Sequence, residues 1–362
     1  MKIGILTFHW ATNYGAVLQA YALQIALADM GHEVYIINYK PEVYDDSLYN
    51  FISMRKYTRP LQYIHDRKKE YALNLFRNKY LNLTRRINRC SEIPKLIQQY
   101  DLIISGSDQV GNPYFLLGGE GRNTITPSYY LGFDYSGCRV AYAMSFGCTI
   151  YPESAREVAS KYLQCFDFIS VREQTGINIV KEMGRLDVAL VPDPTLLHTS
   201  SLYRSFISNK KSFFACDYIY FFILRNVQSY KKMTQTLDLK ARQVWNNENG
   251  AFSMESWLQL IVNALLVITD SFHCVVMCLK FHKRFIVLTE LRGNDGMNDR
   301  FYSLLQKIGL ASRIVEKQSF DYRTYSKFSN DNIDWEYVDA ALIEFASAGK
   351  SFLNNVIANL NR

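Results

Sequence analysis

The stretch VITDSFHC, residues 267–274, contains one of the chain's six histidines. An apolar run typical of a buried strand is followed by Ser271, a good N-cap, so we expect a helix to begin here with His273 in its first turn. The N–H groups of a helix N-terminus bind anions and lower the pKa of a nearby histidine, whereas a bound phosphate raises it again. His273 is therefore either a catalytic acid and base or a buried structural residue.

Three further turns place small and polar residues after apolar runs. The first contains His9, Asn13, Tyr14 and Gly15, the second Gly106, Ser107 and Asp108, and the third Arg172. Asn13 either contacts a ligand or caps a helix, and Asp108 either orients hydroxyl groups or caps one. Arg172 either binds a carboxylate or phosphate with its forked guanidinium or pairs with Glu173 or another carboxylate.

The segments around these turns predict α/β domains. Lys2–Phe8 and Glu33–Tyr39 are typical of strands buried on both faces, and the helix expected between them ends at Gly31. Alternating strands and helices recur over residues 139–191 and 218–308, which favours parallel sheets. Residues 111–135 are expected to form a long loop, and residues 335–360 a long amphipathic helix.

Pro192, Asp193 and Pro194, with the polar residues after them, mark a domain boundary. We predict a Rossmann-like domain over residues 1–198, with a basic insertion at 44–100, and a second over 199–330. A C-terminal helical segment, 331–362, packs back on the rest. Ligands of open parallel sheets bind beyond the carboxyl ends of the strands, which is where all four turns fall.

Charge and composition exclude several classes of protein. The net charge is +7, and between Arg55 and Lys95 twelve basic residues face three acidic ones. This segment is either a solvated helical face or a contact with an anionic membrane or substrate. We find no zinc-finger or RNA-binding signature, so we expect no nucleic acid partner. Seven cysteines without a CxxC pair indicate reduced thiols, no metal site, and a cytoplasmic protein without a spanning helix.

Five motifs in order resemble those of the polysaccharide pyruvyl transferases: TFHWATNYGAVLQAYALQ, SGSDQVGNP, SVRE, DPTLL and VITDSFHC. The resemblance covers roughly residues 1–315. It implies a GT-B-like fold in which two Rossmann-like, doubly wound domains face a central cleft. It also implies phosphoenolpyruvate as donor, a pair of sugar hydroxyls as acceptor, and a cyclic pyruvate ketal and phosphate as products.

The resemblance also suggests roles for individual residues. His273 matches the family's catalytic histidine, Arg172 an arginine that binds the donor, and Asp108 the acidic residue of the GSD motif. Asn13–Ala16 matches the glycine-bearing loop after the first strand. A further basic residue of the donor site corresponds to either Arg292 or Arg300.

The chain departs from the family pattern at two positions. Gly111 stands where we expect tryptophan, and Cys274 stands where we expect glycine. The first change affects stacking on the acceptor, and the second crowds the anion site.

The resemblance implies no cofactor besides the donor substrate. The acceptor is expected to be a lipid-linked oligosaccharide for a bacterial surface polysaccharide (capsule or exopolysaccharide), reached through peripheral contact of residues 55–95 with the inner face of the membrane. Two other readings stay open, because a fold does not fix a function. They are a GT-B glycosyltransferase that uses a nucleotide sugar and a non-catalytic glycan-binding protein.

Overall fold

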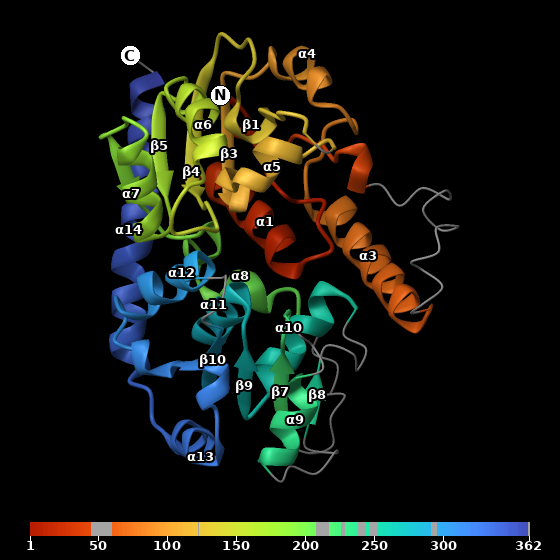
Figure 1. Ribbon diagram of the computed structural model, residues 1–362, viewed down its shortest axis with the longest axis vertical. Coiled ribbons are helices and arrows are strands. Elements are labelled where there is room, and N and C mark those ends of the chain that lie inside the picture. The colour runs from red at the N-terminus through yellow and green to blue at the C-terminus, as the bar shows by residue number, and fades with distance from the viewer. Residues whose placement is uncertain are drawn as a thin grey trace. The chain divides into compact units, whose positions relative to one another are not determined.

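The computed structural model describes residues 1–44, 60–121, 123–207, 217–225, 229–237, 244–246, 252–290 and 295–360. The chain forms two compact units (Figure 1). Unit 1 comprises Met1–Leu197 and Phe345–Arg362, and unit 2 comprises His198–Glu344. The units thus divide one residue before the predicted boundary, and the predicted C-terminal segment 331–362 is shared between them.

Unit 1 is built on a parallel sheet with the strand order β2-β1-β3-β4-β5-β6. The strands are β1 (Lys2–Leu6), β2 (Glu33–Ile36), β3 (Leu102–Asp108), β4 (Cys138–Met144), β5 (Phe168–Val171) and β6 (Val188–Leu190). The central strands β1 and β3 are buried along nearly their whole length, which explains their continuous apolar runs.

The longer helices of unit 1 connect these strands. They are α1 (Tyr14–Asp29), α3 (Pro60–Tyr80), α4 (Ile93–Ile97), α5 (Pro113–Gly118), α6 (Glu153–Leu163) and α7 (Gln174–Glu182). Helix α1 begins after Asn13 and is followed by Gly31, which has φ +86° and accommodates the left-handed turn at the helix end. The β–α–β start predicted from the sequence is therefore confirmed.

Unit 2 has its own parallel sheet, with the order β11-β10-β9-β7-β8. The strands are β7 (Ile219–Phe222), β8 (Val244–Asn246), β9 (Leu266–Thr269), β10 (Phe285–Thr289) and β11 (Ile314–Glu316). The helices are α8 (Ser200–Arg204), α9 (Ser229–Thr236), α10 (Met254–Asn263), α11 (Phe272–Lys280), α12 (Asp295–Leu305) and α13 (Tyr322–Asn330). Phe221, Ile268 and Ile286 of the sheet pack with Met233 of α9 and Phe328 of α13 in one core.

The last helix, α14 (Trp335–Leu360), has the predicted bounds. Its C-terminal part, from Phe345, belongs to unit 1, in agreement with the prediction that this segment packs back. Gly349 makes this packing possible, because a β-carbon there would lie 2.6 Å from the hydroxyl of Tyr142. Nearby, the rings of Phe352 and Tyr142 have centroids 6.1 Å apart.

Several local predictions need correction. Within the basic insertion predicted at 44–100, residues 60–80 form one helix of 21 residues. Only a narrow stripe that includes Leu73 and Phe76 is buried, which leaves little apolar periodicity in the sequence. The expected loop over 111–135 contains α5. Helix α12 lies within the predicted alternation over 218–308, whereas α8, β11 and α13 lie outside the segments predicted to hold strands and helices. No helix among the described residues is long and apolar enough to cross a membrane.

Candidate active site

Both sheets reverse their strand order at one point, and the polar turns of the sequence lie near these points. In unit 1 the chain runs from β1 to β2 on one side and to β3 on the other. In unit 2 it runs from β7 to β8 on one side and to β9 on the other. Such reversals open a crevice beyond the carboxyl ends of the strands, where ligands of doubly wound sheets bind.

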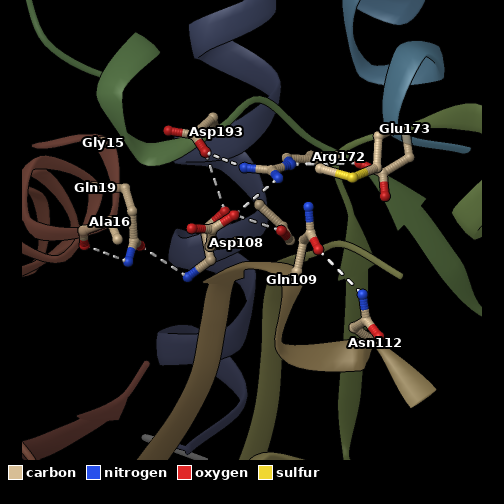
Figure 2. Close-up of polar contacts among 12 residues, drawn as sticks. Gly15, Ala16, Gln19, Asp108, Gln109, Asn112, Arg172, Glu173 and Asp193 are labelled. Atoms are coloured by element: carbon tan, nitrogen blue, oxygen red, sulfur yellow. Dashed lines mark hydrogen bonds and ion pairs between the residues drawn. The ribbon is translucent and has the colours of Figure 1, made fainter. Parts of the chain in front are cut away.

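In unit 1, the guanidinium of Arg172 lies just past β5, buried among three carboxylates (Figure 2). Its Nη1 is 2.8 Å from Oδ2 of Asp193, its Nη2 3.1 Å from Oδ1 of Asp108, and its Nε 3.4 Å from Oε2 of Glu173. Burial disfavours the charged guanidinium, yet the three carboxylates outweigh this and raise the pKa of Arg172. The ion-pair interpretation of Arg172 is confirmed, and its role in donor binding stays a prediction.

This pairing changes what Arg172 offers to a ligand. Three carboxylates surround its guanidinium, so a ligand that binds Arg172 has to compete with them. In the present arrangement Arg172 holds Asp108 in place.

Asp108, the last residue of β3, has an unusual backbone. Its φ is +74°, a region that residues other than glycine rarely adopt. It follows Gly106, where φ is +128° and a β-carbon would collide with the carbonyl oxygen of Tyr142. The N–H of Ser145 donates to the Asp108 carbonyl at 3.0 Å. The strained backbone and Arg172 together fix a carboxylate that keeps 15% of its surface exposed.

Two side chains that sequence reasoning missed, Gln19 and Asp193, hold this turn together. Gln19 of α1 donates through Nε2 to Oγ1 of Thr7 at 2.8 Å and accepts from the N–H of Ser107 at 3.1 Å. Asp193 accepts from the hydroxyl of Ser107 at 3.2 Å and from the N–H of Thr195 at 3.0 Å. The available signals were a glutamine, one of two, in an otherwise apolar helix and a carboxylate between two prolines.

The first turn of α1 shows the capping arrangement rather than an open ligand loop. Oδ1 of Asn13 accepts from the N–H groups of Gly15 at 2.8 Å and Ala16 at 3.4 Å, so Asn13 is the N-cap. Tyr14 is buried, and the ammonium of Lys69 lies 4.4 Å from the centre of its ring. Burial raises the pKa of Tyr14, which keeps its hydroxyl protonated.

His9 lies elsewhere in unit 1, in the wall of a cavity between α3 and the segments that follow β1 and β2. Its Nδ1 is 3.1 Å from the Thr7 carbonyl oxygen, and its Nε2 is 3.2 Å from Oδ1 of Asn38. Burial, with the nearby guanidinium of Arg77, lowers the pKa of His9 to about 4. His9 is therefore neutral at physiological pH.

In unit 2, β9 delivers Ser271 and His273 to the start of α11, as the sequence predicts. Ser271 caps the helix, with its Oγ 3.4 Å from the N–H of Cys274. The hydroxyl of Thr269 donates to the carbonyl of Phe222 at 2.6 Å and fixes β9 beside β7. His273 is buried with 6% of its surface exposed, and its ring meets that of Phe272 edge to face at 5.4 Å.

A cation lies beside this turn. The guanidinium carbon of Arg300, on α12, is 5.8 Å from the ring centre of Phe272 and 5.4 Å from that of Phe301. The other candidate, Arg292, lies outside the described residues. Arg300 therefore lies over Phe272, the residue between Ser271 and His273, whereas Gly106, Ser107, Asp108 and Arg172 gather in unit 1.

Asp270, between β9 and Ser271, is engaged by the backbone. It accepts from the N–H groups of Leu224 at 2.6 Å and Arg225 at 2.9 Å, and so ties the end of β7 to the end of β9. Burial raises the pKa of Asp270, although these two N–H groups oppose the rise.

The two departures from the family pattern have structural explanations. A β-carbon at Gly111 would lie 2.9 Å from the ring of Phe146 and 3.0 Å from Cγ of Met144, so the position has no room for a tryptophan. The Cys274 side chain hydrogen-bonds Cys278, one helical turn further along α11, and both are fully buried. The Cys274 side chain is fully buried, and its effect on an anion site stays a prediction.

Comparison with known proteins places the chain among its relatives. The family model described as polysaccharide pyruvyl transferase matches residues 13–290. This span includes the turns at Asn13, Asp108, Arg172 and His273. A comparison with curated protein sequences gives no match.

Solved structures with similar folds cover nearly the whole chain. MnaA of S. aureus, solved with UDP, has a TM-score of 0.53 at 10% identity, covering 99% of this chain and 97% of that one. The UDP-GlcNAc 2-epimerase of Methanocaldococcus jannaschii, solved with UDP-GlcNAc and UDP, has a TM-score of 0.51 at 13% identity, covering 99% and 100%. The spinosyn forosaminyltransferase SpnP has a TM-score of 0.50 at 9% identity, covering both chains fully. The predicted GT-B-like class is confirmed, and these likenesses concern the fold alone.

Proposed function

The chain belongs to the polysaccharide pyruvyl transferase family, and we propose that it transfers the pyruvyl group of phosphoenolpyruvate to two hydroxyls of a saccharide. The products are a cyclic pyruvate ketal and phosphate. The donor is a substrate, and the proposal needs no further cofactor. The proposed acceptor is a lipid-linked saccharide that is a precursor of a bacterial surface polysaccharide.

The observation that carries the proposal is the turn between β9 and α11. Ser271 caps α11, His273 lies in its first turn, and the guanidinium of Arg300 lies over the ring of Phe272 between them. The N–H groups of the first helical turn and a guanidinium are suited to a phosphate, because both present positive charge and hydrogen-bond donors. His273, in the same turn, is the group placed to exchange a proton next to a bound anion.

The proposed reaction forms two carbon–oxygen bonds at the carbon of phosphoenolpyruvate that carries the phosphate. A proton added to the methylene carbon of phosphoenolpyruvate makes a methyl group and leaves the neighbouring carbon electrophilic. One sugar hydroxyl bonds to that carbon and loses its proton, and phosphate leaves with the electrons of its bond to carbon. The second hydroxyl then closes the ketal and loses its proton. Of the two protons released, one replaces the proton given to carbon and the other goes to phosphate or solvent.

His273 is the proposed acid and base for these transfers. Positioned acid–base groups contribute about 100- to 10,000-fold to a rate. Asp108 is the proposed group for orienting the acceptor hydroxyls, because a fixed carboxylate accepts hydrogen bonds from them. Arg172 holds that carboxylate through Nη2, so its role in this scheme is positioning.

A panel of saccharide acceptors, including galactose-containing ones, tests the proposal. We expect phosphate to be released from phosphoenolpyruvate only when an acceptor is present, and mass spectrometry of the product to show the ketal. Release of a nucleoside diphosphate from a nucleotide sugar, without use of phosphoenolpyruvate, would instead identify a glycosyltransferase. Saccharide binding without phosphate release would identify a glycan-binding protein.

A further inference from the structure

Strand β3 of unit 1 extends past the end of its neighbour β1. The ladder between these two strands ends at the pair Leu6 and Ser105, whereas β3 continues to Asp108 and stays paired with β4 on its other side. Ser107, within this extension, is fully buried. Its backbone N–H and carbonyl therefore need partners that β1 does not supply, because an unpaired polar group in the interior is destabilising.

Two side chains, Thr7 and Gln19, supply these partners. The hydroxyl of Thr7 donates to the Ser107 carbonyl at 3.0 Å, and Oε1 of Gln19 accepts from the Ser107 N–H at 3.1 Å. Nε2 of Gln19 donates to Oγ1 of Thr7 at 2.8 Å and to the carbonyl of Ala16 at 2.9 Å. Thr7 and Gln19 are themselves fully buried. The pair thus takes the place that a further strand residue of β1 would have beside Ser107.

The order of donors and acceptors fixes the orientation of the Gln19 amide. The Ser107 carbonyl only accepts, so the Thr7 hydroxyl gives its one hydrogen to that carbonyl and accepts from Nε2 of Gln19. The Ser107 N–H only donates, so it faces the oxygen of the amide. Each bond in this chain depends on the next, and the loss of either side chain leaves a backbone group of Ser107 without its partner.

Ser107 links this pair of side chains to the Asp108 carboxylate. The carbonyl that Thr7 holds belongs to the peptide bond between Ser107 and Asp108. The hydroxyl of Ser107 donates to Oδ2 of Asp193 at 3.2 Å. The same oxygen accepts from Nη1 of Arg172 at 2.8 Å, and Nη2 of Arg172 donates to Oδ1 of Asp108 at 3.1 Å (Figure 2). These restraints explain how Asp108 keeps a φ of +74°, which residues other than glycine hold only when their surroundings fix it.

We infer that Gln19 and Thr7 are positioning residues for the Asp108 carboxylate. They hold the backbone from which this side chain starts, and Arg172 holds its carboxylate end. Both are fully buried, so they act on a ligand only through Asp108. The inference rests on the proposed function, in which Asp108 orients the acceptor hydroxyls. It adds that a buried amide–hydroxyl pair sets the affinity for the acceptor.

The conformation of Asp108 tests the inference without an assay of transfer. Gln19→Met keeps the length of the side chain, but methionine has no donor for Thr7 and only a weak acceptor for the Ser107 N–H. Thr7→Val keeps the shape of the side chain and removes its hydroxyl. In crystal structures of these two variants we expect Asp108 to leave its φ of +74° and its contact with Arg172. An unchanged Asp108 in both variants would overturn the inference.

The Michaelis constants for the two substrates give a second test. We expect Gln19→Met and Thr7→Val each to raise the KM for the acceptor about tenfold, because the loss of a buried hydrogen bond changes an equilibrium by about that factor. The KM for phosphoenolpyruvate should stay unchanged, since its proposed site is the turn at His273. Thr7→Ser, which keeps the hydroxyl, should retain the wild-type KM for the acceptor. A wild-type acceptor KM in both Gln19→Met and Thr7→Val would contradict a positioning role.

The matched control is Gln24→Met, on the same helix α1. Gln24 is also a buried amide that bridges two backbone groups, donating to the carbonyl of Tyr80 at 3.0 Å and accepting from the N–H of Asn82 at 2.8 Å. The control should lower the urea midpoint about as much as Gln19→Met yet keep both KM values, because its partners lie at the end of α3 and not in β3. An equal rise of the acceptor KM in Gln24→Met would reduce the effect to a general loosening of α1 and overturn the inference. A wild type that releases no phosphate with any acceptor would contradict the proposed function, and the crystal structures would still decide the role of Gln19.

Discussion

The turn at Arg172 in unit 1 and the turn at His273 in unit 2 both follow a strand of a parallel sheet. The charged residues at the two turns have different partners, however. Arg172 is held by three carboxylates of its own unit. Arg300 of α12 lies over the rings of Phe272 and Phe301, and Asp270, three residues before His273, accepts from backbone N–H groups. In the first turn the cation is paired with carboxylates of its own unit, whereas the second turn places a histidine at a serine-capped helix N-terminus.

This difference shows why a charged residue at a strand end does not identify a binding site by itself. A buried guanidinium with ionised partners is a structural element whose removal exposes those partners to one another. A helix N-terminus with a histidine and an arginine presents N–H donors that need an acceptor from elsewhere. The sequence places Arg172 and His273 alike just after apolar strands, and the carboxylates around Arg172 separate the two cases.

The largest expected effect is on the unit 2 turn. His273→Gln removes the proposed acid and base, so the rate of acceptor-dependent phosphate release should fall about 100- to 10,000-fold. The urea midpoint should stay close to that of the wild type, because glutamine keeps polar groups and similar volume. The matched control is His282→Gln, an exposed histidine 3.0 Å from Asp339, which should keep the wild-type rate. A normal rate in His273→Gln would show that His273 is not the acid and base, and the unit 2 turn would lose its proposed catalytic role.

The next effect is on the unit 1 cluster. Arg172→Met leaves the carboxylates of Asp108, Glu173 and Asp193 without their cation, so unfolding in urea should become easier by about 3–5 kcal/mol. The loss should shrink in acid, where protonation relieves the repulsion between the carboxylates. The control Arg89→Met removes an exposed pair with Glu42, 3.4 Å apart, and should change stability by at most about 1 kcal/mol. Unchanged stability with a raised KM for phosphoenolpyruvate would instead make Arg172 a donor-binding residue.

The sequence predicts most strands and helices of the two sheets because their apolar runs are long and their ends are marked. Gly31 and Ser271 show this, since a left-handed turn and a side-chain cap each require a particular residue type. The apolar run of β3 stops at Ile104 in the sequence, yet the strand runs on to Asp108. Polar serines hide the strand pattern there, because their hydrogen-bond partners come from distant parts of the chain.

The candidate site is predictable residue by residue only in part. The order of the motifs singles out His273, Asp108 and Arg172. Which carboxylates pair with Arg172, however, depends on which strand ends meet in space. The contact between Arg172 and Asp193 joins residues 21 positions apart, and that with Asp108 joins residues 64 apart. Nothing in the local pattern around Arg172 distinguishes a guanidinium that meets three carboxylates from one that meets a ligand.

The smallest expected effect is the contribution of the buried His9 to the pH dependence of stability, with the exposed His282 as the control. The pKa of His9 is about 4 in the folded protein, below its ordinary value of 6.5, so between these values the unfolded chain binds more protons and stability falls as pH falls. His9 should therefore account for about 2 kcal/mol of the stability lost between about pH 7 and about pH 5. His9→Gln, which keeps a donor and an acceptor near Thr7 and Asn38, should lose less stability over that range. Urea unfolding of wild type, His9→Gln and the control His282→Gln checks this, and parallel pH dependences for all three would show that His9 is not held neutral by burial.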